Sequence, residues 1–405
     1  MLKCTLAALV ASCLLATPAE AEIITDWAEV AGAISKSDRT LWTVERQFID
    51  VRLSLAMFEA ANAIDRKYRS YLGIDVAAEG ASIEAAVMTA AREVLVRYYP
   101  ERSQEIDGSY QVALAMIVDD AAKQAGVAIG MRAAAAAIAM PDSREGITVL
   151  RYRPITTPGQ WVPVQLPAFS DELALVATLS FADFEEMMPP PPPSLTSDVW
   201  ARDLNEVKLI GGREGSTRTP VQSLNASYRI TPDLIPILRS ITGQPGRSTV
   251  DNARLYALVK IADSDITVVT GLAKLRYNFW RPITAIRNAD QDGNPATTID
   301  PDWRPFINVP NHPEYPCAHC SWTAGLAEVF KAEVGNAPEG GVQVGSESLD
   351  FAVVQTLPTF DRWVEEVSYS RILGGVHYRF SNDAGEALGR RIAMRTLTLL
   401  PPIER

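Results

Sequence analysis

Histidine, cysteine and long hydrophobic segments are scarce in this sequence. Its 405 residues include 3 histidines and 4 cysteines, too few for a disulfide-rich scaffold. Beyond the N-terminus, no segment reaches the roughly 18 uninterrupted apolar residues of a membrane-spanning helix. Basic residues are outnumbered as well, with 38 Lys and Arg against 49 Asp and Glu and a net charge of -11. Such a chain lacks the positive field that binds a nucleic-acid backbone, so we expect small molecules as its partners.

What is present is ordinary globular composition. Apolar residues make up 47% of the chain, charged residues 21% and aromatic residues 8%, which is too apolar for a disordered chain and sufficient for a large core. The length favours two to three domains of ~150 residues, or one helical protein of two bundled halves. The sequence leaves the number of subunits open, so an oligomer is compatible with it.

The N-terminus has the pattern of a signal peptide. One early lysine, Lys3, precedes a mostly apolar stretch over residues 6–16, and residues 19–21, Ala-Glu-Ala, form a small-x-small cleavage pattern. We therefore expect residues 1–21 to be removed on export, which places the mature protein in the periplasm or outside the cell. An N-terminal core helix and a lipoprotein signal ending at Cys13 are the alternatives.

Hydrophobic periodicity predicts an all-α protein. Apolar residues recur at helical spacing, or capping and breaking residues delimit a helix, over residues 45–68, 83–99, 104–123, 124–140, 197–209, 249–274, 321–334, 360–373 and 382–399. No segment is rich in strand signals. Within one of these helices Gly126 and Gly130 lie four residues apart, a spacing typical of a close helix contact or of two merely tolerated glycines.

A proline-rich stretch divides the helices into two groups. Residues 189–193 are five consecutive prolines, and other helix-breaking pairs surround them. We predict an N-terminal helical half over 22–150, a proline-rich connection with a short helix over 151–225, and a C-terminal helical half over 226–405. The proline tract is a rigid crossover in this interpretation, and a ligand for an aromatic groove is the alternative.

All the histidines lie in the C-terminal half, within one short window that also contains two cysteines. The residues concerned are His312, Cys317, His319, Cys320 and His377, with Lys274, Arg281 and Arg371 in the same part of the chain. A local gathering of cations in an acidic protein indicates an anionic ligand. Lysine supplies a point charge and arginine a planar fork, which suit the oxygens of a tetrahedral oxyanion such as phosphate or vanadate.

The order and spacing of these residues resemble a known signature. The three blocks are Lys274 with Arg281-Pro282, the turn Pro316-Cys317-Ala318-His319, and Ser370-Arg371 with His377. Together they resemble the signature shared by vanadium-dependent haloperoxidases and type-2 phosphatidic acid phosphatases. The local sequences of residues 274–282, 370–380, 55–64 and 204–218 are similar to the bacterial haloperoxidase branch, so the resemblance covers most of residues 45–400.

The resemblance implies a role for each of these residues. The groups that hold the oxyanion would be Lys274, Arg281, Cys317, the backbone N–H of Ala318, Arg371 and His377. His377 would bind the central atom, either as the ligand of vanadium in vanadate or as the nucleophile that becomes a phosphohistidine. His319 would be the acid/base group. The N-terminus of the helix that follows it would face the anion.

Two enzymatic functions follow from the resemblance. The first is an exported vanadium-dependent haloperoxidase, which oxidises halide with hydrogen peroxide at a vanadate bound to His377. The second is an acid phosphatase that acts through a phosphohistidine and needs no cofactor. A non-enzymatic protein that binds an oxyanion or senses redox state is the third alternative.

Three positions depart from the family pattern. Cys317 stands where the family has serine, whose hydroxyl is the better hydrogen-bond donor to an oxyanion. Ala318 replaces a glycine, and Ser381 stands where many relatives have an aspartate, four residues after the last histidine. A disulfide between Cys317 and Cys320, which export would allow, would protect the thiols from peroxide.

His312 allows two further interpretations. It lies five residues before Cys317, where relatives carry histidine in bromoperoxidases and phenylalanine in chloroperoxidases, so the resemblance favours bromide or iodide as the halide. A loop histidine bonded to solvent or backbone is the alternative. Zinc held by His312, His319 and the two cysteines is a further alternative.

Overall fold

The computed structural model describes residues 22–37, 43–74, 76, 78–118, 120–141, 152–165, 168, 177–348 and 353–403. The predicted signal peptide, residues 1–21, lies outside these ranges. Export therefore stays a prediction from the sequence.

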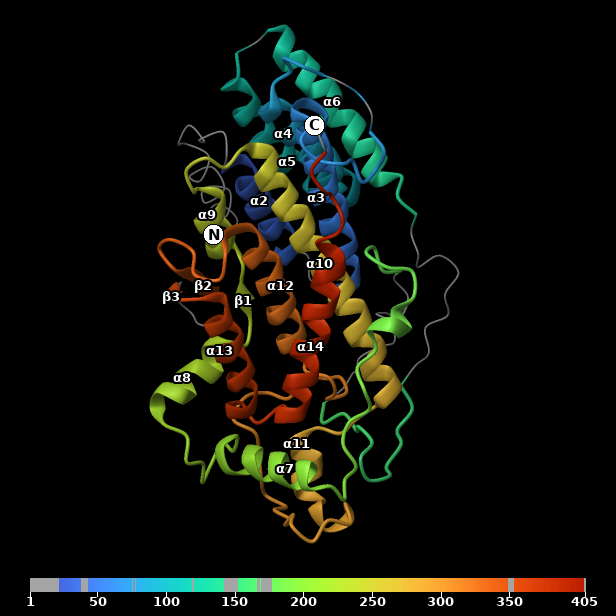
Figure 1. Ribbon diagram of the computed structural model, residues 1–405, viewed down its shortest axis with the longest axis vertical. Helices are drawn as coiled ribbons and strands as arrows, with labels where there is room; N and C mark the ends of the chain where they lie inside the picture. Colours follow the sequence, from blue (N-terminus) through green and yellow to red (C-terminus); the bar gives the residue numbers. More distant parts are fainter. Residues whose placement is uncertain are drawn as a thin grey trace. The chain divides into compact units, whose positions relative to one another are not determined.

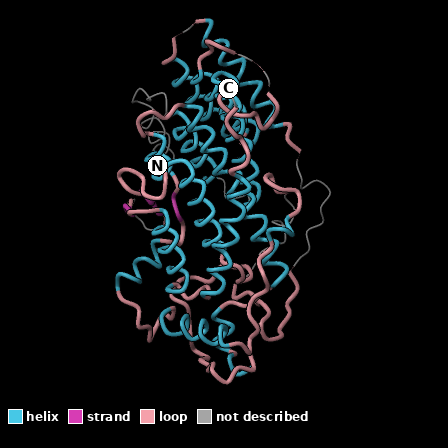
Figure 2. The backbone as a smooth tube through the Cα atoms, viewed as in Figure 1, coloured by secondary structure: helices cyan, strands magenta, loops and turns pink. Residues whose placement is uncertain are grey.

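The described residues are predominantly helical, as Figure 2 shows, and the all-α prediction is confirmed. The helices are α2 (Ile23–Ser37), α3 (Thr43–Asp65), α4 (Ile83–Tyr98), α5 (Ser103–Ala115), α6 (Ala121–Ile138), α7 (Asp198–Ile210), α8 (Pro220–Tyr228), α9 (Ile235–Thr242), α10 (Thr249–Tyr277), α11 (Pro282–Arg287), α12 (Ala318–Val334), α13 (Phe360–Leu373) and α14 (Arg379–Thr396) (Figure 1). Among the helices of these ranges, none combines the length and apolarity needed to cross a membrane.

Every helix predicted from the sequence is present, with shifted ends. The predicted cap works as expected, because the Ser82 side chain accepts the N–H of Ala85 at 3.1 Å and starts α4. The helix predicted over 104–123 ends early, at Ala115, and Asp120 caps the next helix by accepting the N–H of Lys123. Helices α8, α9 and α11 were not predicted, because their apolar stripes are short. Helix α2 was also missed, although its apolar residues recur at helical spacing.

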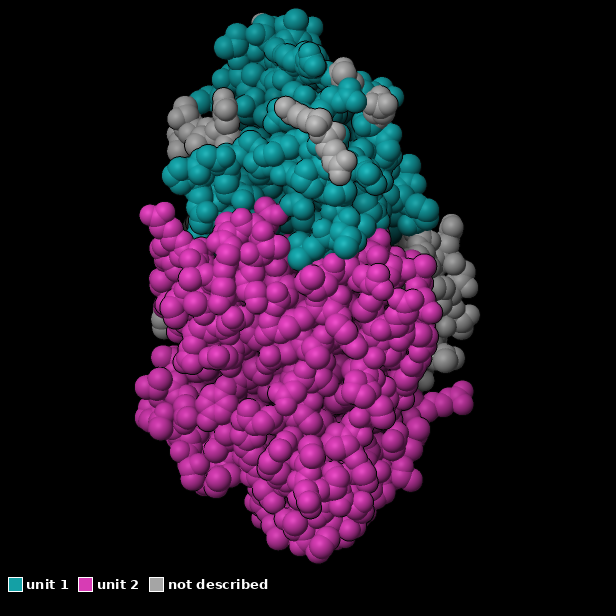
Figure 3. Space-filling view, in the orientation of Figure 1, with its two compact units in different colours: residues 1–142, 235–264, 396–405 teal, residues 143–234, 265–395 magenta. Residues whose placement is uncertain are grey.

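The chain forms two compact units that do not follow the predicted boundaries. Unit 1 comprises residues 1–142, 235–264 and 396–405, and unit 2 comprises 143–234 and 265–395 (Figure 3). Residues 235–264, expected in the C-terminal half, therefore group with the N-terminal helices. The division at residue 264 falls inside α10, whose 29 residues supply both units.

Close helix packing in unit 1 depends on two glycines. Helix α4 packs against α3 and α6. A Cβ at Gly126 would lie 2.3 Å from the carbonyl oxygen of Ser82, and one at Gly130 would lie 2.4 Å from that of Ala86. Because real Cβ atoms do not approach so closely, the close-contact interpretation of this pair is confirmed.

In unit 2, glycines also fix the position of α12. A Cβ at Gly389 of α14 would lie 1.9 Å from the carbonyl oxygen of Ser321 in the first turns of α12. At Gly325 of α12, a Cβ would lie 2.9 Å from the carbonyl oxygen of Gly389. The N-terminal part of α12 is therefore held against the backbone of α14.

A small sheet in unit 2 was not predicted. Strands β1 (Pro232–Asp233), β2 (Val342–Ser346) and β3 (Gln355–Leu357) pair antiparallel in the order β1-β2-β3. Val342 pairs with Leu357, and Val342 and Val344 are buried. Such short strands carry almost no alternation that a sequence pattern could reveal.

An aromatic cluster packs beside the residues that carry the predicted chemistry. Trp200 of α7 stacks on Trp280, with ring centroids 5.8 Å apart, and Tyr378 stacks on Phe380 at 5.1 Å. Trp280 and Tyr378 directly adjoin Arg281 and His377 in the chain. Their large buried rings restrict the backbone at both positions.

We predict opposite effects for two glycine substitutions in unit 1. Gly130→Ala should lower the free energy of unfolding by about 1–3 kcal/mol, because the added methyl group overpacks the α4–α6 contact. Gly108→Ala is the matched control, because a Cβ there has no neighbour within 4 Å. It should raise the free energy of unfolding by about 0.5–1 kcal/mol, since it lowers the backbone entropy of the unfolded chain. Urea denaturation measures both, and equal changes would contradict the packing interpretation.

Candidate functional site

In unit 2 the predicted cations and His377 are buried, and Arg281 contacts both His377 and His312. Lys274 lies in the last turn of α10, Arg281 is the residue before α11, Arg371 lies in the last turn of α13, and His377 lies between α13 and α14. Their exposed fractions are 4%, 0%, 1% and 1%, respectively. Charged side chains are almost never buried to this extent without a specific partner. Their burial therefore indicates a functional arrangement.

Lys274 organises the turn that precedes α12. Its Nζ donates to the carbonyl oxygens of Pro313 at 3.0 Å, Glu314 at 2.7 Å and Pro316 at 2.6 Å. An ammonium group has three donors, so all of them are engaged. Burial, and secondly the charge of Arg281, lower the pKa of Lys274 to about 7.

Arg281 fixes the proton position on His377 and contacts His312. Its guanidinium contacts His377 Nε2 at 3.1 Å and His312 Nδ1 at 3.0 Å, and it donates to the carbonyl oxygen of Val376 at 2.8 Å. Because arginine is only a donor, Nε2 of His377 must accept, so His377 carries its proton on Nδ1. The Nδ1 of His312 also lies 3.0 Å from the carbonyl oxygen of Pro313, so its contacts do not fix the tautomer of this ring.

Glu314 is the functional residue that the sequence did not reveal. Its Oε1 accepts the Nδ1–H of His377 at 2.6 Å and the backbone N–H of Tyr378 at 3.3 Å. The carboxylate is fully buried, and burial raises its pKa to about 7 although Arg281 and Lys274 oppose the shift. The sequence pattern gave no signal for this contact, because Glu314 and His377 lie 63 positions apart.

Arg371 is the cation with unused donors. Its Nε and Nη1 are buried and have no hydrogen-bond partner. A buried charged donor left unpaired costs ~1–3 kcal/mol or more. An anionic ligand would remove that cost.

Helix α12 adds backbone donors to the same place. It begins at Ala318, so the N–H groups of Ala318 and His319 belong to a first turn that has no carbonyl partner within the helix. These groups and the positive end of the helix favour an anion. Together with the unpaired Arg371 donors and the lone pair of His377 Nε2, they fit a tetrahedral oxyanion such as vanadate or phosphate.

His319, the predicted acid/base group, is uncharged in this arrangement. Its Nε2 contacts the carbonyl oxygen of Ile230 at 2.9 Å. Burial, followed by the charge of Arg371, lowers its pKa to about 3. A proton on this ring therefore requires a negative charge nearby.

The possible disulfide between Cys317 and Cys320 is not formed in this structure. Cys317 and Cys320 are both free and buried. Cys317 is the N-cap of α12, and its Sγ accepts the N–H of Cys320 at 3.3 Å, so the sulfur is engaged with the helix backbone instead of with the second sulfur. Among the described residues, no three His, Cys, Asp or Glu side chains are arranged to hold a metal ion, so the zinc alternative gains no support.

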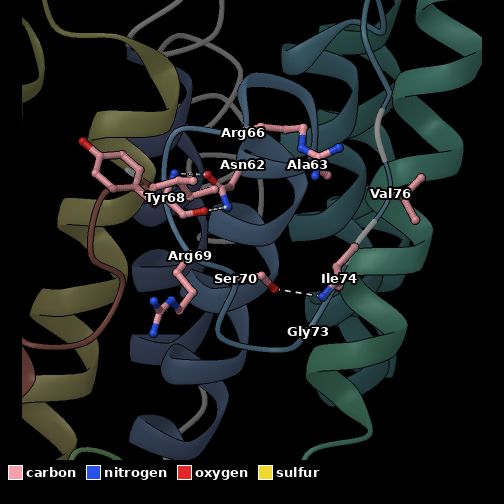
Figure 4. A pocket seen from close by; sticks show the side chains of 10 residues that line it. Asn62, Ala63, Arg66, Tyr68, Arg69, Ser70, Gly73, Ile74 and Val76 are labelled. Atoms are coloured by element: carbon pink, nitrogen blue, oxygen red, sulfur yellow. Dashed lines mark hydrogen bonds between the residues drawn. The ribbon is translucent and has the colours of Figure 1, made fainter. Parts of the chain in front are cut away.

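A separate pocket in unit 1 contains none of the predicted site residues. It measures about 340 Å³ and lies at the turn after α3, where Asn62 donates to the carbonyl oxygen of Tyr68 at 2.7 Å (Figure 4). Ser70 Oγ accepts the N–H of Ile74 at 2.8 Å in the same turn. These contacts stabilise the turn and supply no chemistry.

We predict that Glu314 reinforces the Nδ1-protonated tautomer of His377 that Arg281 imposes. In Glu314→Gln, the amide oxygen can still accept from Nδ1, so the tautomer should persist, whereas Glu314→Ala leaves only the Arg281 contact and should weaken the preference. ¹⁵N NMR of the imidazole ring reports the protonated nitrogen directly, and the signal is assigned with His377→Gln. A wild-type protein protonated on Nε2 would contradict the interpretation.

We also predict that an oxyanion raises the pKa of His319. Without a ligand the ring should stay neutral down to about pH 3. Bound phosphate would offset the charge of Arg371 and move the pKa toward the ordinary value of about 6.5. NMR titration of the His319 ring protons with and without phosphate measures the change. An unchanged pKa would exclude an anion at this place.

The site residues lie in a part of the chain that is similar to known proteins. The sequence profile of the family described as the VCPO second helical-bundle domain matches residues 254–401. A vanadium-dependent bromoperoxidase of Ascophyllum nodosum is 28% identical over 148 residues, which cover 34% of this chain and 25% of that protein. A vanadium chloroperoxidase of Curvularia inaequalis is 30% identical over 94 residues, which cover 21% of this chain and 15% of that protein. The chain thus matches a quarter or less of the length of these curated relatives.

Solved structures extend the similarity to almost the whole fold. A bacterial vanadium-dependent iodoperoxidase aligns with a TM-score of 0.75 and 16% identity over 95% of this chain and 98% of that one. The holo form of a bacterial vanadium-dependent chloroperoxidase aligns with a TM-score of 0.66 and 16% identity over 95% of this chain and 96% of that one. Residues 254–401 thus match the VCPO second helical-bundle domain, and the fold of the chain resembles that of the bacterial vanadium-dependent peroxidases.

Proposed function

We propose that this protein is an exported vanadium-dependent haloperoxidase that oxidises halide with hydrogen peroxide at a vanadate bound by His377. The observation that carries the proposal is the pair formed by His377 and Arg371. The first has a lone pair on a buried nitrogen, and the second has buried donors without an acceptor. Similar proteins that are named bromo-, chloro- and iodoperoxidases support the same chemistry.

Each residue of the site would have a separate role. Glu314 accepts the Nδ1 proton of His377 and so keeps the lone pair on Nε2, which would pass from the contact with Arg281 to the vanadium atom. Arg371 and the first N–H groups of α12 would hold the oxygens, and Arg281 adds positive charge next to His377. Lys274 fixes the turn that carries Glu314 and Cys317. Bound vanadate would supply the activation of peroxide toward halide.

His319 is the group that moves a proton. It occupies the second position of α12, beside the N–H groups that would face the anion. A dianion would raise its low pKa, because it offsets the charges of Arg371 and Arg281 that lower it. The ring would then be able to give a proton to a bound oxygen and take it back.

The position of His312 supports bromide or iodide as the halide. Its Nδ1 lies 3.0 Å from both Arg281 Nη2 and the carbonyl oxygen of Pro313, so the ring is held beside the cations of the site. The side chain is partly exposed, so halide has access to it. A ring N–H at this place can donate to a halide ion.

An acid phosphatase is the second candidate, and the contact between Glu314 and His377 favours it. A histidine that carries its proton on Nδ1 and is hydrogen-bonded to a carboxylate is also an activated nucleophile at Nε2. In that reaction His319 would protonate the leaving oxygen, and no cofactor would be needed. Vanadate would then inhibit the enzyme, whereas it would activate a haloperoxidase.

The deciding experiment is halogenation of a colour-changing phenol by bromide, iodide and peroxide, before and after addition of orthovanadate. Phosphomonoester hydrolysis is measured beside it on the same purified protein. We expect halogenation that depends on vanadate. Hydrolysis that vanadate inhibits, without halogenation, would identify the phosphatase instead.

Two variants test the site itself. His377→Ala should abolish turnover with the fold intact, and Arg371→Gln should weaken vanadate binding roughly 10- to 100-fold, as expected for loss of charged hydrogen bonds. Arg362→Gln is the matched control, because this arginine lies on the same helix, α13, with a half-exposed side chain. Equal affinities of Arg371→Gln and Arg362→Gln would refute the proposed anion site.

A further inference from the structure

The first turn of α12 contains two thiols that the proposed function does not use. Cys317 is the N-cap and Cys320 is the third residue of the helix. The sulfur of Cys317 accepts the N–H of Cys320 at 3.3 Å, and the sulfur of Cys320 donates to the hydroxyl of Ser368 at 3.9 Å. One sulfur is thus an acceptor at a helix N-terminus and the other is a donor, as in a thiolate beside a thiol.

The charge that faces these sulfurs comes from Arg371. Its buried Nε and Nη1 have no hydrogen-bond partner, and the groups that support its positive charge are Cys317 and Cys320. Lys274 adds a second positive charge near Cys317. Such positive charge and a helix N-terminus favour the thiolate of a cysteine. Cys317 and Cys320 are themselves 0% and 1% exposed, so peroxide has to enter the buried oxyanion site to reach them.

The two cysteines differ in acidity in the direction that this geometry requires. Burial raises the pKa of Cys317, but the hydrogen bonds from Cys320 and the charge of Arg371 outweigh it, so the pKa is lowered. Burial and the neighbouring Cys317 raise the pKa of Cys320 well above its ordinary value. Cys317 is therefore suited to attack, and Cys320 is suited to remain a thiol until it is needed.

We propose that Cys317 and Cys320 form a peroxide-reactive dithiol inside the oxyanion site, in which Cys317 is oxidised first and Cys320 resolves it to a disulfide.

Both steps balance with hydrogen peroxide as the only oxidant. The Cys317 thiolate attacks one peroxide oxygen and the O–O bond breaks, which gives a sulfenic acid and hydroxide, and hydroxide takes a proton to become water. The Cys320 sulfur then attacks the Cys317 sulfur, the S–O bond breaks, and the sulfenic oxygen leaves as water with the thiol proton. Two electrons pass from the pair of sulfurs to peroxide.

The thiolate and an oxyanion share Arg371. A bound phosphate would occupy the donors of Arg371 and raise the pKa of Cys317 by like-charge repulsion. Phosphate should therefore slow the oxidation of Cys317. This competition distinguishes a dithiol in the site from one that merely lies near it.

The test uses the reduced full-length protein with hydrogen peroxide, without halide or vanadate, so its outcome is independent of the proposed function. Mass spectrometry of the peptide that carries both cysteines excludes interference from Cys4 and Cys13. The wild-type peptide should lose two hydrogens and regain them with dithiothreitol. Added inorganic phosphate should slow this reaction.

Two serine variants separate the roles of the sulfurs. Cys320→Ser should stop at a sulfenic acid on Cys317, trapped with dimedone, at a rate at least about tenfold above that of Cys320 in Cys317→Ser. Serine is a good N-cap, so Cys317→Ser keeps α12, which circular dichroism checks. A wild-type peptide left unchanged by peroxide, equal rates in the two variants, or no effect of phosphate would each overturn the proposal.

Discussion

The guanidinium of Arg281 is the interaction on which the site depends. It has donors and no acceptor, so each neighbour has to present a lone pair to it. His377 does so with Nε2, and the carbonyl of Val376 does so with its oxygen. The tautomer of His377 and its contact with Glu314 follow from this requirement. The ligating nitrogen is therefore oriented before any ligand arrives, which is the form of preorganisation that gives catalytic sites most of their effect.

This arrangement leaves an excess of buried positive charge, which costs free energy. Three cations are buried around one carboxylate, and the lowered pKa values of Lys274 and His319 express the resulting repulsion and desolvation. A bound anion would relieve both and would stabilise the fold by mass action. The glycine contacts between α12 and α14 hold the helix terminus in place against this repulsion.

Local signals in the sequence predicted most of the described helices and pointed to the cations that the structure buries, but they did not reveal features that depend on distant residues. The cap at Ser82 and the ordered cations can be recognised because each depends on neighbours in the chain. Glu314 could not be assigned, because its role depends on His377, 63 positions away. The grouping of residues 235–264 with the N-terminal helices depends likewise on packing partners, and the strands are too short to show a period. The absence of the disulfide could not be predicted, because spacing does not show that the Cys317 sulfur caps a helix.

The guanidinium of Arg281 also links the place where halide preference would be set to the place where the metal would be bound. Arg281 contacts the ring of His312, where halide preference is expected to be set, and the ring of His377, where the metal would be bound. A change at residue 312 releases one donor of Arg281, and the charge felt by His377 changes with it. Effects at the two positions are therefore energetically coupled and non-additive. Under the proposed function, a substitution at residue 312 that changes halide selectivity would also change vanadate affinity.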